Sequence, residues 1–277
     1  MDNRVIDYDI LDERRAKKER NTYGTYKFQC IDQVSKKYDL VIVPVNSYQL
    51  CDALIEINQQ VPSARYLIMS LNWIGASEID AIIRPEQYVM GYAGGGGTLK
   101  DKNSILWGNI GNDVMLGCVY EAQNSLLRDV NALFLESGIT PEIPSNVLHA
   151  LWLQNVASAP FGAAFSKHKD IMKTFADKEL VRVCFKAFRE CYDILSARGV
   201  NLKDFPEAKM FSLLFKLPIS IQLYMLKKNL SGEAAQRYTS HALFALDEMK
   251  NNFAQILDTA RELNVYVPNM EKLNSLI

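Results

Sequence analysis

The polar residues that could take part in chemistry follow two short, largely apolar runs. Asn46 and Gln49 lie directly after the run 39–45, and Asn72 follows the run 65–71. Ligands of open parallel sheets bind beyond the carboxyl ends of the strands, so amide side chains at these positions could orient a polar ligand. An ordinary turn after a strand requires the same residue types, and the pattern alone leaves both interpretations open.

A second group of polar residues lies on segments with helical periodicity. Gln154 and Ser158 are four residues apart on a predicted helix over 146–158 and therefore lie one turn apart on the same face. Glu248 lies about 120° from the centre of the apolar stripe of another predicted helix, over 242–263. An amide, a hydroxyl and a carboxylate can hold a substrate by hydrogen bonds. The solvated flank of a helix also explains these residues, and this alternative stays open.

Neither the histidines nor the cysteines indicate a metal site, so we predict no bound metal. The three histidines lack metal-ligand spacing, and we expect them to be structural or surface residues: His149, His168 and His241. The five cysteines are widely spaced with no CxxC pair, which favours reduced thiols over a disulfide framework or a zinc site. Cys184 and Cys191 are seven residues apart on one predicted helix and should be buried as small hydrophobic side chains.

Apolar periodicity predicts strands alternating with helices, followed by helices alone. The runs 39–45 and 65–71 predict parallel strands joined by a helix that ends at Pro62. Further elements are predicted as a strand over 5–11, a helix over 13–20, short antiparallel strands over 88–117 and a helix over 119–137. Beyond Ser145 the pattern is helical, most regularly over 177–198 and 242–263. We therefore expect an α/β fold with a sheet domain over 1–144 and an all-α C-terminal domain over 145–277.

Composition excludes several classes of function. Lys plus Arg (31) nearly balance Asp plus Glu (32), which leaves no electrostatic footprint for nucleic acid or an anionic membrane. The apolar stretch 211–226 is interrupted by Lys216 and Pro218, and the first residues do not resemble a signal peptide. We expect a cytoplasmic protein.

The run Gly94–Gly97 does not fit GxGxxG and should be a flexible connection or a bulge.

Four segments, taken in order, resemble the ketopantoate reductase (2-dehydropantoate 2-reductase) family. The first is the apolar strand with its following Gln, at 38–49, and the second is the Leu-Asn-Trp-Ile-Gly turn at 71–75. The third is the Trp-containing helix at 151–158, and the fourth is the Asp-Glu pair at 247–248 with the Arg-Glu-Leu ending at 260–268. The resemblance implies an incomplete Rossmann-type parallel sheet before a helical domain like that of 6-phosphogluconate dehydrogenase. It also implies NADPH-dependent reduction of a small 2-keto acid in pantothenate biosynthesis, by a protein that could form a homodimer.

The resemblance also assigns roles to individual residues. Asn72, Ser158 and Ser240 would contact the substrate, and Glu248 would accept a hydrogen bond from its hydroxyl group. Arg14, Asn46 and Gln49 would contact the cofactor, with Arg14 near the position that distinguishes a ribose hydroxyl from a 2′-phosphate. Gln154 would occupy the catalytic position.

Several positions depart from the family pattern. Gln154 stands where the family has its catalytic lysine, and glutamine can donate a hydrogen bond but cannot act as a general acid. Asn46 replaces a lysine, Ser158 replaces an asparagine and Trp73 replaces a glycine. We find no counterpart of the family's first strand and GxGxxG loop, which we attribute to truncation or divergence, so we expect weak NADPH binding. The alternative function is that of a non-catalytic binding or interaction protein on the same scaffold.

Overall fold

The computed structural model describes residues 2–34, 38–70, 73–100, 104–111, 114–230, 232–244 and 246–277. Their contacts define two units. The first contains Met1–Leu148 and also Arg237–His241, and the second contains His149–Gln236 and Ala242–Ile277. The contacts therefore divide the chain after residue 148, whereas the sequence analysis placed the boundary at residue 144. They also assign the short segment 237–241, which comes later in the chain, to the first unit. Each unit is described by itself below.

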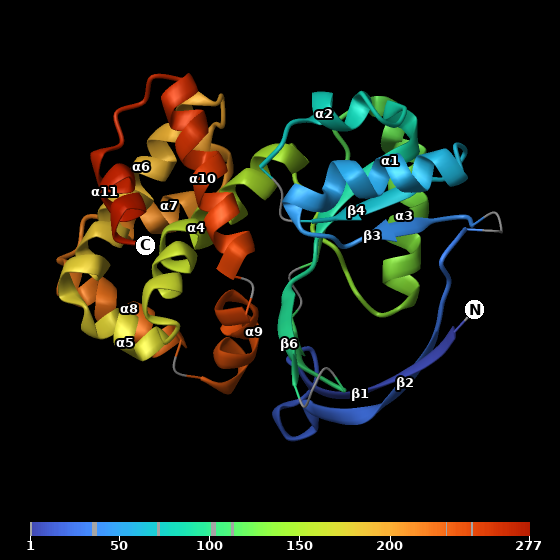
Figure 1. Cartoon of the computed structure of the whole chain (residues 1–277), viewed down its shortest axis with the longest axis horizontal. Coiled ribbons are helices and arrows are strands. Elements are labelled where there is room, and N and C mark those ends of the chain that lie inside the picture. The colour runs from blue at the N-terminus through green and yellow to red at the C-terminus, as the bar shows by residue number, and fades with distance from the viewer. Residues whose placement is uncertain are drawn as a thin grey trace. The chain divides into compact units, whose positions relative to one another are not determined.

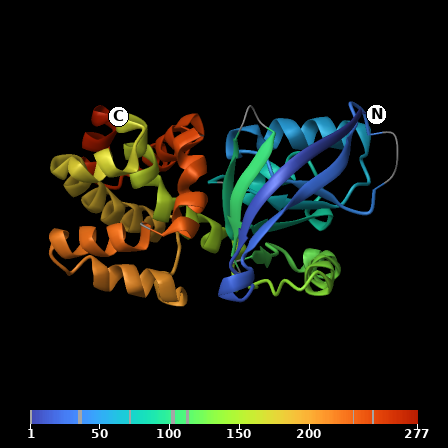
Figure 2. The same ribbon diagram turned by 90° about the horizontal axis from the view of Figure 1, so that it is seen from below.

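One sheet of the first unit is built from the apolar runs that the sequence singled out. Its strand order is β3-β4-β5-β8, with β3 (Val41–Val43), β4 (Tyr66–Met69) and β5 (Tyr88–Tyr92) parallel and β8 (Met115–Gly117) antiparallel. Helix α1 (Leu50–Gln60) connects β3 to β4, α2 (Ala76–Asp80) lies between β4 and β5 in the chain, and α3 (Asn124–Glu136) follows β8. Figure 2 shows α1 and α3 on opposite faces of this sheet.

Burial on both faces explains why these strands are apolar throughout. Tyr66, Leu67 and Ile68 are fully buried, although their side chains alternate between the two faces. The side chains of β4, β5 and β8 that face α3 pack against its apolar stripe: Leu67, Val89 and Leu116 against Leu126, Leu127 and Val130. The expectation of antiparallel strands over 88–117 is wrong for β5, since Tyr66 pairs with Tyr88 in parallel register. It is also wrong for residues 105–110, which pair in parallel with residues 7–12.

The other sheet of the first unit has the strand order β2-β1-β7-β6. Strands β1 (Asp2–Asp12) and β2 (Asn21–Cys30) form an antiparallel hairpin, the blue ribbons in Figure 1. Strand β7 (Ile105–Ile110) runs parallel to β1 and pairs on its other side with β6 (Gly95–Lys100). The first strand predicted from the sequence is therefore present, but it belongs to a sheet different from that of β3 and β4.

The predicted helix over 13–20 is wrong. This segment is the turn of the β1–β2 hairpin and holds only a short 3₁₀ helix, Lys17–Glu19. Its residues are mostly charged and offer no apolar stripe that a helix could bury. The carboxylate of Asp12 instead accepts hydrogen bonds from Arg14 and Arg15, and the Asp12 N–H donates to the Arg20 carbonyl oxygen at 2.7 Å. These bonds close the turn.

The glycine run is also not the flexible connection that the sequence suggested, because Gly95–Gly97 form the first half of β6. A Cβ atom at Gly96 would lie 2.5 Å from the carbonyl oxygen of Tyr238. One at Gly97 would lie 2.7 Å from the carbonyl oxygen of Trp107 on β7. The glycines are therefore required by backbone that approaches the strand closely.

The second unit is helical, as predicted. Its helices are α4 (Val147–His168), α5 (Ile171–Ala176), α6 (Lys178–Ala197), α7 (Pro206–Leu214), α8 (Ile219–Leu230), α10 (Leu246–Glu262) and α11 (Pro268–Leu276). The two ends of α9 (Glu233–Phe244) also belong to this unit, while its middle, Arg237–His241, is the segment that belongs to the first unit. The helix predicted over 146–158 continues through Pro160 to His168. The predicted helix over 242–263 is represented by the end of α9 and by α10.

The most periodic segment, α6, has the ends that its sequence predicted. Asp177 caps its start by accepting a hydrogen bond from the Leu180 N–H at 3.0 Å, and Gly199 follows its end with φ +92°. Cys184 and Cys191 are fully buried on this helix, as expected. All five cysteines are free thiols in the structure. Among the described residues no helix is long and apolar enough to cross a membrane.

Candidate active site

Two of the predicted cofactor residues lie where the parallel sheet predicted them. Asn46 and Gln49 follow the carboxyl end of β3, with Gln49 exposed and the Asn46 Nδ2 donating to the Tyr48 hydroxyl at 3.1 Å. The Ser70 hydroxyl, at the end of β4, donates to the Val45 carbonyl oxygen at 2.8 Å. This bond joins the turns after the two strands, as expected for adjacent parallel strands. Asn72 lies outside the described residues.

Arg14 lies on the other sheet, in the turn after β1. Its Nε and Nη2 donate to the two carboxylate oxygens of Asp12 at 2.7 and 2.8 Å. The Arg14 side chain holds the pKa of the buried Asp12 carboxyl at about 2, below its usual value of 3.8. The guanidinium fork that would bind a ribose 2′-phosphate is thus engaged by a carboxylate of the same turn.

The strand-to-helix turns decide whether a dinucleotide cofactor fits the described residues. The pyrophosphate of such a cofactor needs a glycine-rich turn whose backbone N–H groups point at it from a helix N-terminus. Within the described residues the turns before α1, α2 and α3 contain a single glycine, Gly75, which precedes the five-residue helix α2. The described residues therefore do not form a pyrophosphate cradle. Trp73, which stands in place of the family's glycine, is buried.

The predicted catalytic and substrate residues of the helical unit lie on two helices in contact. Gln154 is half-buried and Ser158 exposed on one flank of α4, and the Ser158 hydroxyl donates to the Asn155 carbonyl oxygen at 3.1 Å. Glu248 lies in the first turn of α10 and is half-buried. The next residue, Met249, packs so closely on α4 that a Cβ at Gly162 would lie 2.8 Å from its sulfur. The structure thus brings all three residues onto neighbouring elements.

Asn155 is a further polar residue of α4, next to Gln154 in the sequence. Its side chain is 1% exposed, and its Nδ2 has no hydrogen-bond partner among the described residues. A buried amide with an unused donor lowers the stability of the fold. Asn155 is therefore a further polar group of α4 beside Gln154 and Ser158 that its burial alone does not explain. The spacing of Asn155 from Leu151 and Trp152, four and three residues, explains its burial on an apolar face of α4, but it gives no sign of the unused donor.

Ser240 belongs to the segment 237–241 that returns to the first unit. It is 6% exposed, and its hydroxyl donates to the Arg237 carbonyl oxygen at 2.7 Å. Two residues before it, the Tyr238 hydroxyl shares a hydrogen bond with the hydroxyl of Tyr92 at the end of β5. Ser240 is therefore held on the sheet unit, whereas Ser158 lies in the helical unit.

Sequence reasoning missed Arg237, a buried cation in the same segment. Only 3% of its side chain is exposed, and its Nη1 donates to the Asp9 carboxylate and the Asp9 carbonyl oxygen, both at 2.8 Å. It also donates to the Gly108 carbonyl oxygen at 3.2 Å and lies over the Trp107 ring. The one signal in the sequence is Gly96, where a Cβ would lie 2.5 Å from the carbonyl oxygen of the neighbouring Tyr238, but it does not identify Arg237.

His149 and His168 have structural surroundings, and the side chain of His241 lies outside the described part of the chain. Burial lowers the pKa of His149, whose ring lies beside Trp152, and the His168 Nε2 lies 3.2 Å from the Asp177 carboxylate. The described residues contain no group of three or more His, Cys, Asp and Glu side chains that could hold a metal ion.

Known proteins resemble this chain in structure but not in sequence. No model of a protein family matches, and no curated protein matches. The dimeric ketopantoate reductase from Staphylococcus aureus superposes with a TM-score of 0.70 at 14% identity, over 99% of this chain and 86% of its own. The 2-dehydropantoate 2-reductase from Geobacter metallireducens gives 0.69 at 13% identity, over 97% and 85%.

A D-mandelate dehydrogenase solved with NADH is also similar, with a TM-score of 0.63 at 12% identity over 87% of this chain and 77% of its own. Identities this low carry no information about individual residues, but similarity over most of each chain defines the fold. A Rossmann-like sheet unit and a helical C-terminal unit give this chain the fold of the ketopantoate reductases.

Proposed function

We propose that this protein is a ketopantoate-reductase-like oxidoreductase that reduces a small 2-keto acid, of the 2-dehydropantoate type, to the 2-hydroxy acid. NADPH would be the reductant, and the reaction would belong to pantothenate biosynthesis in the cytoplasm. The observation that carries the proposal is the placement of Gln154, Ser158 and Glu248 on the contacting helices α4 and α10 of this fold. The solved ketopantoate reductases and the NADH-bound dehydrogenase of similar fold support it.

The chemistry of these three residues suits the binding of a keto acid. The Gln154 amide can donate a hydrogen bond to a carboxylate or keto oxygen, and Ser158 offers a hydroxyl one turn away. Glu248 can accept a hydrogen bond from the hydroxyl group of the substrate. Because glutamine cannot give up a proton, we expect turnover to be slower by about 10²–10⁴-fold than with an acid at this position. Without a pyrophosphate cradle among the described residues, we also expect the NADPH dissociation constant to exceed the low micromolar range.

A second candidate function is non-catalytic binding of the same class of keto acid. It is favoured by the glutamine at position 154 and by the absence of a glycine-rich strand-to-helix turn among the described residues. In this case Gln154, Ser158 and Glu248 would bind the ligand without turning it over.

The experiment measures 2-dehydropantoate-dependent NADPH oxidation at millimolar cofactor, with calorimetric titration of the keto acid in parallel. Slow turnover that falls at least about tenfold in Glu248→Gln, but not in Asp247→Asn, supports the reductase. Asp247 is the matched control because it is an exposed carboxylate next to Glu248 on the same helix. Keto acid binding without turnover supports the second candidate. Absence of both would contradict either function.

We also propose a homodimer. The solved ketopantoate reductase from Staphylococcus aureus is described as dimeric. In this chain α7, α8 and the segment between them expose a group of large apolar side chains: Met210, Leu213, Leu217, Ile221 and Tyr224. Several large apolar side chains exposed on neighbouring elements are typical of an interaction site.

A further inference from the structure

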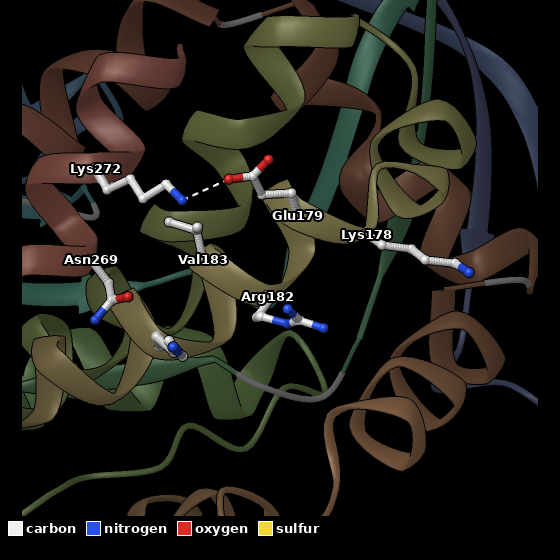
Figure 3. Close-up of a pocket in the computed structure, with 7 residues that line it drawn as sticks. Lys178, Glu179, Arg182, Val183, Asn269 and Lys272 are labelled. Atoms are coloured by element: carbon white, nitrogen blue, oxygen red, sulfur yellow. Dashed lines mark hydrogen bonds and ion pairs between the residues drawn. The ribbon is translucent and has the colours of Figure 1, made fainter.

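A basic pocket lies on the helical unit, and its lining includes none of the residues of the candidate active site. It has a volume of about 490 Å³ and is formed by the first half of α6 together with α11. Four cations and one carboxylate line it: Lys178, Arg182, Lys186 and Lys272, with Glu179. Figure 3 shows Lys272 bound to Glu179 on one side, while Lys178 extends on the other. Four positive charges against one negative give the lining a net charge of +3.

Three of the cations form a stripe along α6. Lys178, Arg182 and Lys186 are spaced four residues apart and therefore lie on one face. In the described part of the chain none of the three side chains has an ion pair or a hydrogen bond. Like charges one turn apart destabilise a helix, and a lysine as the first helical residue opposes the helix dipole. The stability of α6 therefore gives no reason for this arrangement.

The nearby acidic residues do not neutralise the stripe, because each has other partners. Asp177 caps α6 and contacts Lys167 and His168. Glu190 is buried and accepts the backbone N–H groups of Asn269 and Met270 at the start of α11. Glu179 pairs with Lys272 at 2.7 Å. The charge of Lys178, Arg182 and Lys186 is therefore available to a ligand.

We propose that this pocket binds a small molecule that carries two or more linked phosphate groups. Eight residues of α-helix separate the ends of the stripe by about 12 Å, which is too far for a single phosphate to contact every cation. The Arg182 guanidinium can bind one phosphate by two parallel hydrogen bonds, while the lysines supply point charges on either side. The volume lies within the range of small-molecule sites. This ligand site is independent of the proposed keto acid site.

The test is calorimetric titration of the full-length protein with tripolyphosphate, ATP and inorganic phosphate at constant ionic strength. We expect one tripolyphosphate per chain, with inorganic phosphate at least about tenfold weaker. An ATP affinity equal to that of tripolyphosphate would mean that only the phosphate chain is recognised. A higher ATP affinity would mean that the protein also contacts the nucleoside. Both results support the site, and hydrogen exchange should then show protection within α6 and α11.

Charge variants locate the ligand. Arg182→Glu with Lys186→Glu should weaken tripolyphosphate binding by at least about tenfold. The control, Lys209→Glu with Lys216→Glu, changes the net charge by the same amount at exposed positions elsewhere in the same unit. It should leave the tripolyphosphate affinity within about twofold of that of the unmodified protein. If the first pair unfolds the protein, Arg182→Gln with Lys186→Gln serves instead. Glu179→Gln should tighten binding, because it removes the one carboxylate of the lining. Equal loss in both pairs, or no tripolyphosphate binding by the unmodified protein, would overturn the proposal.

Discussion

At the scale of single residues, one buried carboxylate holds the turn after β1. Asp12 is 4% exposed and accepts hydrogen bonds from Arg14 and Arg15, and its pKa falls to about 2. A carboxyl group whose pKa is lower in the folded state than in the unfolded state stabilises the fold at pH values above its unfolded-state pKa. This stabilisation disappears as the pH falls through the folded-state pKa. The stabilisation by Asp12 should therefore be complete above about pH 4 and lost towards pH 2.

The variant Asp12→Asn tests this link between pKa and stability. At pH 7 it should lower the free energy of unfolding by about 1–2 kcal/mol, and the difference from the unmodified protein should shrink between pH 4 and pH 2. Urea denaturation at several pH values measures both effects. Asp258→Asn is the control, since Asp258 pairs with Arg261 at an exposed site and should cost less than about 1 kcal/mol. A pH-independent difference for Asp12→Asn would rule out the assigned cause.

The cysteines should differ in reactivity according to burial. Burial raises the pKa of Cys184 to about 12 and raises that of Cys191 as well, and both side chains are fully buried. Cys30, Cys51 and Cys118 are partly exposed. Because the thiolate is the reactive form, iodoacetamide should modify these three in the native protein and reach Cys184 and Cys191 only after unfolding. Mass spectrometry of peptides from native and urea-treated samples measures this, and native alkylation of Cys191 would contradict it.

Residue positions that depend on local spacing were accessible from the sequence. Four-residue spacing placed Gln154 and Ser158 on one flank of α4, and the apolar run 39–45 placed Asn46 at the end of a strand. Arg237 was not accessible, because its partners Asp9 and Gly108 lie 228 and 129 positions away in the sequence. The assignments of function to Gln154, Glu248 and the other site residues stay predictions.

At the scale of elements, the glycines of β6 make a specific demand on packing. Gly96→Ala would place a Cβ 2.5 Å from the Tyr238 carbonyl oxygen, and backbone on both sides limits relaxation. We expect a loss of about 1–3 kcal/mol in the free energy of unfolding. Gly232→Ala is the matched control, since no atom lies within 4 Å of the added Cβ, and its effect should be near zero. Thermal and urea denaturation compare the two, and equal stability would show that β6 and Tyr238 are not in contact.

The elements that the sequence predicted well are those fixed by their own periodicity. Helix α6 has an apolar stripe, an Asp cap and a following glycine within one continuous segment. The β1–β2 turn and β6 depend instead on distant or cross-strand partners: Leu11 pairs with Asn21, and Gly97 pairs with Gly108. Glycine has little strand propensity of its own, so a strand through Gly95–Gly97 could not be predicted without the backbone that surrounds it.

At the scale of the whole molecule, the proposed homodimer can be measured directly. Sedimentation velocity of the unmodified chain should give the mass of two chains at micromolar concentration. Leu213→Glu with Tyr224→Lys changes two side chains that are 64% and 67% exposed on α7 and α8, and should shift the protein to the monomer mass. Met172→Glu alters an equally exposed apolar residue on α5 and should have no effect. A monomeric unmodified chain, or a dimer that survives the double variant, would contradict this interface.

The ribosome makes the first unit as two separate segments, residues 1–148 and residues 237–241. Between Leu148 and Arg237 the ribosome adds residues 149–236, which are 88 residues (236 − 148) of the other unit. At about 5–20 residues per second this takes roughly 4–18 s. During that interval the nascent sheet lacks the guanidinium that joins Asp9 to Gly108, and the backbone of residue 238 does not yet cover β6. The nascent chain is therefore most open to chaperones and proteases before residue 241 emerges. A stop codon anywhere within 149–236 would leave the sheet unit incomplete even though β1 to β8 had been made.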